Sequence, residues 1–253
     1  MLQWLVKIKH YLMKRLFWIF VFFVGLTGSV SAQLMGGLII PQPPFANQYP
    51  SGTVFCASGP TAIVDVINPT TGRTWMDRNL GASQLATSST DALAYGDLYQ
   101  WGRRADGHQC RNSATTTILS TTDQPGHGDF ILAPDLPADW RSTTNNSLWE
   151  GVNGVNNPCP IGYRLPTGAE LNAERLSWSN GNSLGAFNSP LRFTKAGSRR
   201  RETGAIVNIN IWGVYWSSST VTSFSRHIYF DDSIVYIDID LRANGRSVRC
   251  IKN

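Results

Sequence analysis

The chain has 253 residues, 42% of them hydrophobic and 15% charged, which is enough apolar material for a folded core. Its formal net charge is +5, from 22 basic and 17 acidic residues. Four basic and no acidic residues precede residue 33, so the rest of the chain has 18 basic and 17 acidic residues. This near balance excludes a general affinity for polyanions, and we expect no nucleic-acid partner. The one basic cluster, Arg199-Arg200-Arg201, predicts a solvated loop.

Residues 1–32 have the pattern of a secretory signal peptide. Four basic residues precede the apolar run LFWIFVFFVGL, and a small-residue stretch ending at Ala32 follows it. The run is shorter than the roughly 20 residues that span a bilayer. We therefore expect cleavage after Ala32 and no membrane span in the mature chain; the alternative is an uncleaved membrane anchor.

A single domain is expected after a short arm. Residues 33–53 are rich in Pro and Gly, which indicates a linker or N-terminal arm. No composition break and no internal repeat divides residues 54–253. At the start of this domain, AIVDVI (62–67) and RTWMDR (73–78) predict two short strands, joined by the turn NPTTG.

Two helices are predicted. Asp91 and the residues before it could cap the N-terminus of a first helix, which would include the segment ALAYGDLYQWG. Gly96 disfavours the interior of this helix. Thr167 and Glu170 form a capping box, which predicts a second helix ending near Trp178. Between the two, residues 103–157 show no periodic pattern and indicate long irregular loops.

Strand patterns return from residue 191, in LRFT, AIVNINI, VYWSSS, RHIYF, IVYIDIDL and SVRCI. Two helices followed by a late antiparallel sheet predict an α+β domain. Side chains alternate between the faces of a strand. A hairpin over 226–242 would then bury Ile228, Phe230, Val235, Ile237, Ile239 and Leu241. Its outer face would display His227, Tyr229, Asp231, Tyr236, Asp238 and Asp240.

The residues offer no catalytic constellation. The histidines after the signal peptide, His108, His127 and His227, lie outside any HExxH pattern, and neither a GxSxG nor a phosphate-binding motif occurs. Two sets of side chains could hold a metal: His127 with Asp129, and the aspartates 231, 232, 238 and 240. We interpret the first as a structural loop and the second as a solvated hairpin face. No metal and no cofactor are expected.

All four cysteines, Cys56, Cys110, Cys159 and Cys250, follow the signal peptide. An even number in an exported chain indicates disulfides. Four cysteines allow three pairings, and the residues alone do not choose among them.

Five motifs occur in order: GRTWMDRNLGA, YGDLYQWGR, NPCPIGYRLPTGAEL, GVYWSSS and GRSVRCIKN. Over about residues 56–253 the chain resembles the Fibrobacter succinogenes major paralogous domain family of exported bacterial proteins. The resemblance implies a C-type-lectin-like fold, in which the chain ends meet in a sheet and the last strands present the ligand surface. It also implies a mature protein that is secreted, periplasmic or on the outer cell surface.

Further expectations follow from this resemblance. The last strand of such a fold returns towards the middle of the sheet, which implies the disulfides Cys159–Cys250 and Cys56–Cys110. The chain departs from sugar-binding C-type lectins, because it lacks their Glu-Pro-Asn and Trp-Asn-Asp calcium motifs. It departs from the related formylglycine-generating enzymes as well, because Cys250 is the only cysteine after Cys159.

These observations predict a non-catalytic binding or display module whose partner is an extracellular protein or a glycan. Tyr offers apolar area and a hydroxyl at low entropic cost, and Asp offers acceptors and discourages edge-to-edge association of strands. The predicted ligand-binding residues are His227, Tyr229, Asp231, Asp232, Ser233, Tyr236, Asp238 and Asp240. The alternatives are an enzyme of the formylglycine-generating type and a structural envelope protein without a ligand.

Residues 217–246 contain no Lys, Glu, Gln, Met or Trp. These five types are unreachable when both adenines of an AAC codon are randomised. The stretch therefore resembles the variable region of proteins diversified by retroelements, many of which use a C-type-lectin-like fold. Ordinary strand composition, which also disfavours Lys, Glu and Gln, is the other explanation.

Overall fold

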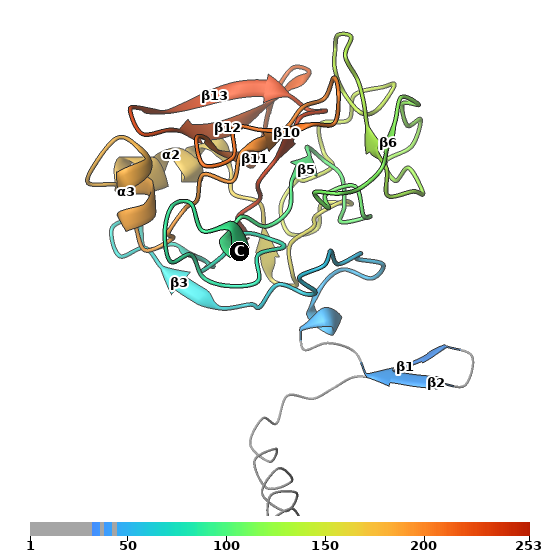
Figure 1. The fold of residues 1–253 in the computed structure, drawn as a ribbon, viewed down its shortest axis with the longest axis horizontal. Helices are drawn as coiled ribbons and strands as arrows, with labels where there is room; N and C mark the ends of the chain where they lie inside the picture. The colour runs from blue at the N-terminus through green and yellow to red at the C-terminus, as the bar shows by residue number, and fades with distance from the viewer. Residues whose placement is uncertain (1–31, 36–37, 42–44) are drawn as a thin grey trace, which may run out of the picture. The chain divides into compact units, whose positions relative to one another are not determined.

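The computed structural model describes residues 32–35, 38–41 and 45–253. The chain divides into two units, Met1–Pro44 and Phe45–Asn253. In the first unit, β1 (Ala32–Met35) and β2 (Leu38–Pro41) pair as an antiparallel hairpin (Figure 1). The predicted signal peptide lies outside the described residues except for Ala32, and its cleavage stays a prediction.

The second unit begins at Phe45, ahead of the predicted domain boundary at residue 54. After the short helix η1 (Ala46–Gln48), the ring of Tyr49 is buried and lies edge-on to Phe55, with 5.3 Å between ring centroids. The Tyr49 hydroxyl donates to the carbonyl of Thr61 at 2.8 Å. Residues 45–53 therefore belong to the domain, because a core aromatic ring anchors them.

A four-stranded antiparallel sheet joins the two ends of the domain. Its order is β3 (Asp65–Ile67), β4 (Thr74–Met76), β15 (Ile251–Lys252) and β8 (Tyr163–Arg164). The strands β3 and β4 are the predicted hairpin, shorter than expected, with the Asn68 carbonyl accepting from Gly72 N at 2.8 Å in the turn. The C-terminal strand pairs with β4 and with β8, so the end of the chain lies inside the sheet.

The longest strands form a separate sheet, here called the late sheet. It contains β11 (Gly213–Val221), β12 (Phe224–Phe230) and β13 (Val235–Leu241), paired antiparallel in that order (Figure 1). Residues opposite each other share a face. The Ile228–Ile237 and Phe230–Val235 pairs lie on the inner face, where Ile228 and Phe230 are fully buried and share a hydrophobic cluster with Leu171 of α2 (Gly168–Leu176).

Six further short strands occur in the described residues. Four of them form a sheet in the order β10-β9-β14-β5, and the other two, β6 and β7, pair in parallel. Their bounds are β5 (Tyr99–Gln100), β6 (Thr115–Thr116), β7 (Phe130–Ile131), β9 (Ser198–Arg199), β10 (Ile206–Val207) and β14 (Gly245–Arg246). Strands of two residues cannot form a core by themselves, so loops and side chains hold this region together.

Only the second of the two predicted helices forms. Thr167 Oγ1 accepts from Glu170 N at 3.2 Å, and the Glu170 carboxylate accepts from Thr167 N at 2.8 Å, so the capping box opens α2 as predicted. The segment after Asp91 makes one turn, η2 (Ala92–Ala94), because Gly96 takes φ +65° and packs against a carbonyl oxygen. The other helix, α3 (Ser183–Asn188), was not predicted.

Buried polar side chains hold the loop-rich segment 103–157. Arg103 is fully buried and donates to Asp106 and to the carbonyls of His127 and Asp129. Arg199 is likewise buried, donating to the carbonyls of Cys110, Ser113 and Gly204. The predicted solvated loop 199–201 is therefore wrong at Arg199, because carbonyl groups of distant loops converge on its guanidinium.

The cysteines form the bonds Cys56–Cys110 and Cys159–Cys250, the pairing that the family resemblance implies. Cys159 and Cys250 lie in a hydrophobic cluster with Trp101, Trp140, Trp149 and Trp216. Disulfides persist in oxidising compartments, which agrees with an exported protein.

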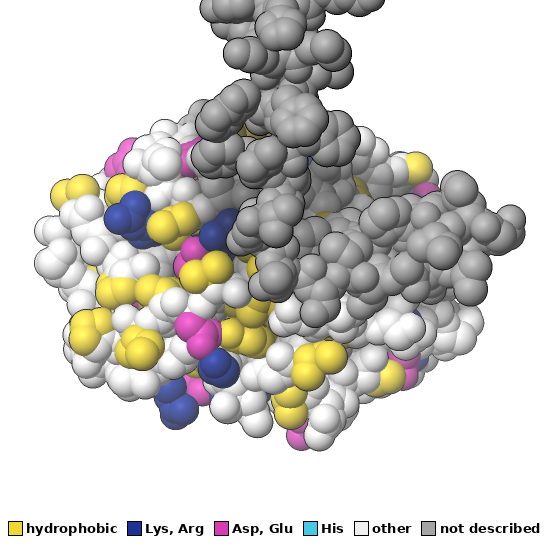
Figure 2. All heavy atoms as spheres, turned by 90° about the horizontal axis from the view of Figure 1, so that it is seen from below, with side chains coloured by type: hydrophobic (Ala, Val, Ile, Leu, Met, Phe, Trp, Pro, Cys, Tyr) yellow, Lys and Arg dark blue, Asp and Glu magenta, His cyan; other side chains and the backbone are white. Residues whose placement is uncertain are grey.

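Two α-helices and many antiparallel strands make the described residues an α+β structure, as predicted. Among the residues that the structure describes, no helix has the length and apolarity needed to cross a membrane. On the face seen in Figure 2, Lys and Arg side chains are interspersed with Asp and Glu. The visible part of that face has no continuous basic area, in keeping with the near-neutral charge of residues 33–253.

Candidate functional site

The outer face of the late sheet has an open groove of about 250 Å³. Five of the eight predicted ligand-binding residues line it: His227, Tyr229, Tyr236, Asp238 and Asp240. The other lining residues are Trp212, Val214, Ile239 and Arg246. Strand alternation brings the five together, because the His227–Asp238 and Tyr229–Tyr236 pairs lie directly opposite each other on β12 and β13.

Three aromatic rings form a continuous shelf along the groove, here called the aromatic shelf: Trp212, Tyr229 and Tyr236. Tyr229 stacks on Tyr236 with 4.8 Å between centroids and 18° between planes. Trp212 meets Tyr229 edge-on at 5.5 Å. Tyr236 is 38% exposed and Tyr229 only 9%. Tyr229 lies on the predicted face, but it is not exposed as predicted, because its two aromatic neighbours cover it. The exposed ring of Tyr236 is the surface offered to a ligand.

The Tyr229 hydroxyl is held in place by the hairpin tip. It donates to Asp231 Oδ2 at 2.7 Å. Burial and this hydrogen bond both raise the pKa of Tyr229, so the phenol stays protonated. Asp231 in turn accepts from the backbone N–H groups of Ser233 and Ile234. Asp231 and Ser233 therefore shape the turn and lie outside the groove.

Asp232 also lies outside the groove and makes structural contacts. Its Oδ1 accepts from Lys195 Nζ at 2.6 Å and from the hydroxyl of Ser183, the first residue of α3. Asp232 is exposed, whereas Lys195 is buried. This contact fastens the hairpin tip to α3, so three of the predicted residues (Asp231, Asp232 and Ser233) do not join the other five.

Two carboxylates in the groove differ sharply. Asp240 accepts from Arg246 Nε at 2.9 Å and from Asn244 Nδ2 at 2.9 Å. Burial alone would raise the pKa of Asp240, but Arg246 outweighs it and the pKa falls. Asp238 is exposed, and within the described residues its hydrogen-bond contact is the N–H of its neighbour Ile239. Asp238 is therefore the carboxylate available to a ligand.

His227 forms part of the groove floor. It was predicted to lie outside, but it is 7% exposed because β11 and β13 flank it and Trp216 meets it edge-on at 6.0 Å. Its Nδ1 has no hydrogen-bond partner among the described residues. Burial, helped by Arg246, lowers the pKa of His227 to about 4, so the ring is neutral at pH 7. An unpaired buried polar atom is costly, and because this atom is itself covered, the packing of the neighbouring strands has to offset that cost.

The inner face also departs from its predicted burial. Ile228 and Phe230 are fully buried, but Ile239, which also borders the groove, is 38% exposed. β13 is the edge strand, and Ile239 lies opposite the exposed Arg226. The alternation of a strand gives the face of a residue but not whether that face is covered.

Trp212, Val214 and Arg246 were not among the predicted site residues. Trp212 precedes β11 and Arg246 lies on β14, and only the packing of these elements beside the hairpin brings them to the groove. A weak signal existed for Val214, because it alternates with Tyr215 in the strand pattern VYWSSS.

The acidic residues that could have bound a metal do not converge. In the described part of the chain, no three His, Cys, Asp or Glu side chains are arranged to hold a metal ion. The His127 Nδ1 and Asp129 Oδ2 atoms are 3.8 Å apart, and both side chains are exposed. Asp231 and Asp232 are occupied at the hairpin tip.

Comparison with known proteins gave no match: no protein-family model, no curated protein and no solved structure is similar to this chain. The residues of the groove are therefore the main indication of a function. They offer one exposed aromatic ring, one available carboxylate and a neutral histidine, set on three paired strands. This chemistry suits non-covalent recognition of a group that has both an apolar side and hydrogen-bond donors.

Proposed function

We propose that the mature chain is an exported, non-catalytic binding module that holds part of an extracellular protein or glycan in the groove of the late sheet. The observation that supports this most directly is the exposed Tyr236 ring beside the available Asp238 carboxylate. Pockets for whole small molecules are usually about 300–1,000 Å³. A groove of about 250 Å³ suits one sugar unit or one side chain of a larger partner.

Membership of the Fibrobacter succinogenes major paralogous domain family, with its C-type-lectin-like fold, is part of this proposal. Supporting observations are the return of β15 to a position between β4 and β8 and the Cys159–Cys250 bond that fixes it there. Two disulfides support export. The expected location is outside the cytoplasm of a bacterium: secreted, periplasmic or on the outer cell surface.

An enzyme of the formylglycine-generating type has less support. That chemistry uses a reactive cysteine pair near the C-terminus, whereas Cys250 is fully buried and bonded to Cys159. A structural envelope protein without a ligand differs from our proposal in a measurable way, since only a binding module loses an interaction when the groove is altered.

Binding to glycan arrays and to intact cells tests the groove. The variant Tyr236→Ala with Asp238→Ala removes the exposed ring and the available carboxylate, and should weaken binding at least about tenfold, as expected for central contact residues. Phe45→Ala with Asp135→Ala, an exposed aromatic and an exposed acid elsewhere, is the matched control and should bind as the unaltered protein does. Equal binding by both variants would exclude this groove as the ligand site.

Diversification of the groove by a retroelement is a further part of the proposal. The stretch 217–246, which lacks Lys, Glu, Gln, Met and Trp, supplies seven of the nine residues that line the groove. The flanking DNA tests this: a near-copy of the coding segment for 217–250, differing mainly at adenines and beside a reverse transcriptase gene, is the expected finding. Without such a copy, diversification is excluded and the binding module alone is left.

A further inference from the structure

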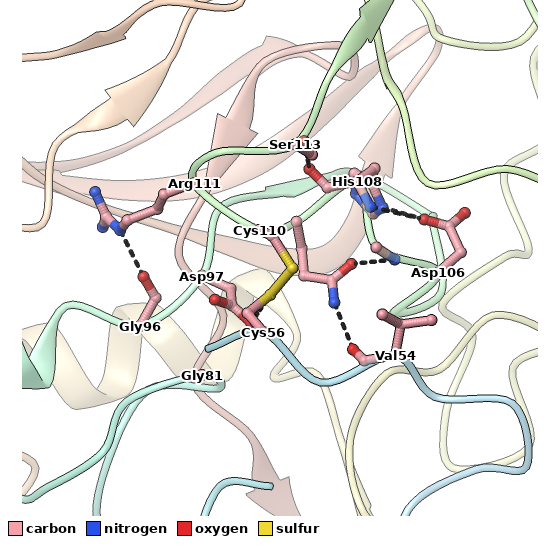
Figure 3. Close-up of a disulfide and its surroundings, with 12 residues drawn as sticks. Val54, Cys56, Gly81, Gly96, Asp97, Asp106, His108, Cys110, Arg111 and Ser113 are labelled. Atoms are coloured by element: carbon pink, nitrogen blue, oxygen red, sulfur yellow. Dashed lines mark hydrogen bonds and ion pairs between the residues drawn. A yellow bond between two sulfur atoms is a disulfide. The ribbon is translucent and has the colours of Figure 1, made fainter. Parts of the chain in front are cut away.

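The Cys56–Cys110 disulfide lies beside a buried carboxyl group (Figure 3). Asp97 is 7% exposed, and its Oδ2 is 3.3 Å from Sγ of Cys56. A disulfide sulfur has no hydrogen, so a hydrogen bond across this contact needs the proton of the carboxylic acid. Among the described residues, this is the hydrogen-bond contact that the Asp97 side chain makes.

Two glycines bring the carboxyl group to the sulfur. Gly81 faces Asp97 so closely that a Cβ atom on it would lie 2.2 Å from Asp97 Cγ. Gly96 takes φ +65°, and the next N–H, that of Asp97, donates to the Leu80 carbonyl at 2.9 Å. Asp97 and Cys56 border a common cavity of about 10 Å³, about the space that one water molecule needs. Because Gly81 has no side chain, the backbone leaves room for the Asp97 carboxyl group beside Cys56.

The surroundings favour the neutral acid. Burial raises the pKa of Asp97 to about 7, and Arg111 only partly offsets it. Arg111 donates to the carbonyl of Gly96 (Figure 3) and to that of Ala196, instead of to the carboxyl group. The other titratable groups nearby are Tyr49 and Tyr99, and burial raises the pKa of both phenols, so they stay neutral. Asp97 can therefore hold a proton near neutral pH and give it up to a stronger base.

The two disulfides differ in access. Cys56 and Cys110 are partly exposed, whereas Cys159 and Cys250 are 1% and 0% exposed. The residues of the first bond therefore lie at the boundary between core and solvent, whereas those of the second lie inside the core.

We propose that Cys56–Cys110 is a thiol–disulfide exchange site for an external dithiol, with Asp97 as its proton donor. A thiolate of the dithiol attacks Sγ of Cys110, forms a mixed disulfide and breaks the Cys56–Cys110 bond. The electron pair leaves on Sγ of Cys56, which takes the proton of Asp97. The second thiol of the reagent loses its proton to solvent and attacks the reagent's own sulfur in the mixed disulfide. Cys110 leaves as a thiolate and, like the Asp97 carboxylate, regains a proton from solvent.

The net change oxidises the dithiol to a disulfide and reduces the two cysteines to thiols. The segment that holds Cys56 has contacts with the domain other than the disulfide. The Val54 carbonyl accepts from the Gln109 side chain at 2.8 Å (Figure 3). The Val54 N–H donates to the Ala105 carbonyl at 2.7 Å. Tyr49, seven residues before Cys56, is buried in the core. The segment that holds Cys56 is thus kept near Cys110, which makes the exchange reversible.

Reduction of the mature protein by dithiothreitol, followed by alkylation and peptide mapping, tests the proposal. Cys56–Cys110 should be reduced at least about tenfold faster than Cys159–Cys250 under native conditions, because only exposed disulfides exchange without unfolding. The rate per reagent thiolate should fall as the pH rises through about 7, where Asp97 loses its proton. Equal rates for the two disulfides would overturn the proposal.

Asp97→Asn keeps the shape and removes the acid. At pH 6 it should slow the reduction of Cys56–Cys110 by about tenfold, less than most general acids give because a thiolate is already a fair leaving group. Its rate per thiolate should then be independent of pH, whereas the control Asp135→Asn should keep the original profile. If Asp97→Asn misfolds, the unaltered protein still provides the test. A rate of Cys56–Cys110 reduction per thiolate that does not change with pH would exclude Asp97 as the proton donor.

Discussion

Cys159–Cys250 lies in the core among four tryptophans, whereas Cys56–Cys110 is partly exposed and touches the buried acid Asp97. The two bonds close segments with sequence separations of 91 and 54 residues. In the chain-entropy model this difference is worth less than about 0.5 kcal/mol. Any larger difference in stability or reactivity must therefore come from their neighbours, so the surroundings of a disulfide decide whether it is a core staple or a reactive site.

Removing each bond separately should give the largest effect. Cys159→Ala with Cys250→Ala is expected to lower the free energy of unfolding by about 6 kcal/mol, because a core cavity adds about 2 kcal/mol to the lost cross-link. Cys56→Ala with Cys110→Ala should cost about 4 kcal/mol, close to the cross-link alone. Urea unfolding monitored by tryptophan fluorescence measures both. Equal losses would mean that the surroundings contribute nothing.

A smaller effect on stability is expected from Asp97, the acid beside the Cys56–Cys110 bond. Because the pKa of Asp97 is raised in the folded state, to about 7, the unfolded chain releases its proton first as the pH rises from about 4 to 7. The folded state loses stability over that window. Asp97→Asn removes this loss, so its stability relative to the unaltered protein should rise by about 4 kcal/mol between pH 4 and pH 8. Urea unfolding at both pH values measures the change, and a constant difference between the two proteins would contradict a raised pKa.

The smallest effect is expected from the glycine that faces the acid. Gly81→Ala adds a Cβ atom where the carboxyl group of Asp97 lies, at φ +81°, and should cost about 2 kcal/mol. It should also move the carboxyl group from Cys56 and slow dithiol reduction of that bond, while leaving Cys159–Cys250 unchanged. Gly72→Ala, at φ +67° with nothing within 4 Å of its Cβ position, is the matched control for backbone strain. If both variants are reduced at the original rate, contact with Asp97 does not govern the exchange.

Features that depend on neighbours in the chain were predictable. The capping box of Thr167 and Glu170, the β3–β4 hairpin and the β12–β13 hairpin all form, because each is set by contacts within a few residues or by strand alternation. The exception was the helix after Asp91. Gly96 ends it through a close approach to Leu80, a contact that the local pattern does not contain.

The candidate site was predictable only in part. Alternation placed Tyr236 and Asp238 on one face correctly, but it did not reveal that aromatic neighbours cover Tyr229 or that Lys195 occupies Asp232. Trp212 and Arg246 come from other elements, and no local pattern links them to the hairpin.

By itself, the sequence determined the α+β class, the capped helix, the strand faces and the presence of disulfides, because these follow from residue type, period and short-range contacts. Only the tertiary structure decided which polar groups are buried. It placed Asp97 beside Cys56, buried His227 and Arg199, and left Asp238 open. Burial and electrostatic neighbours are set by residues far apart in the chain, and these two quantities determine whether a carboxyl group or a disulfide is inert or reactive.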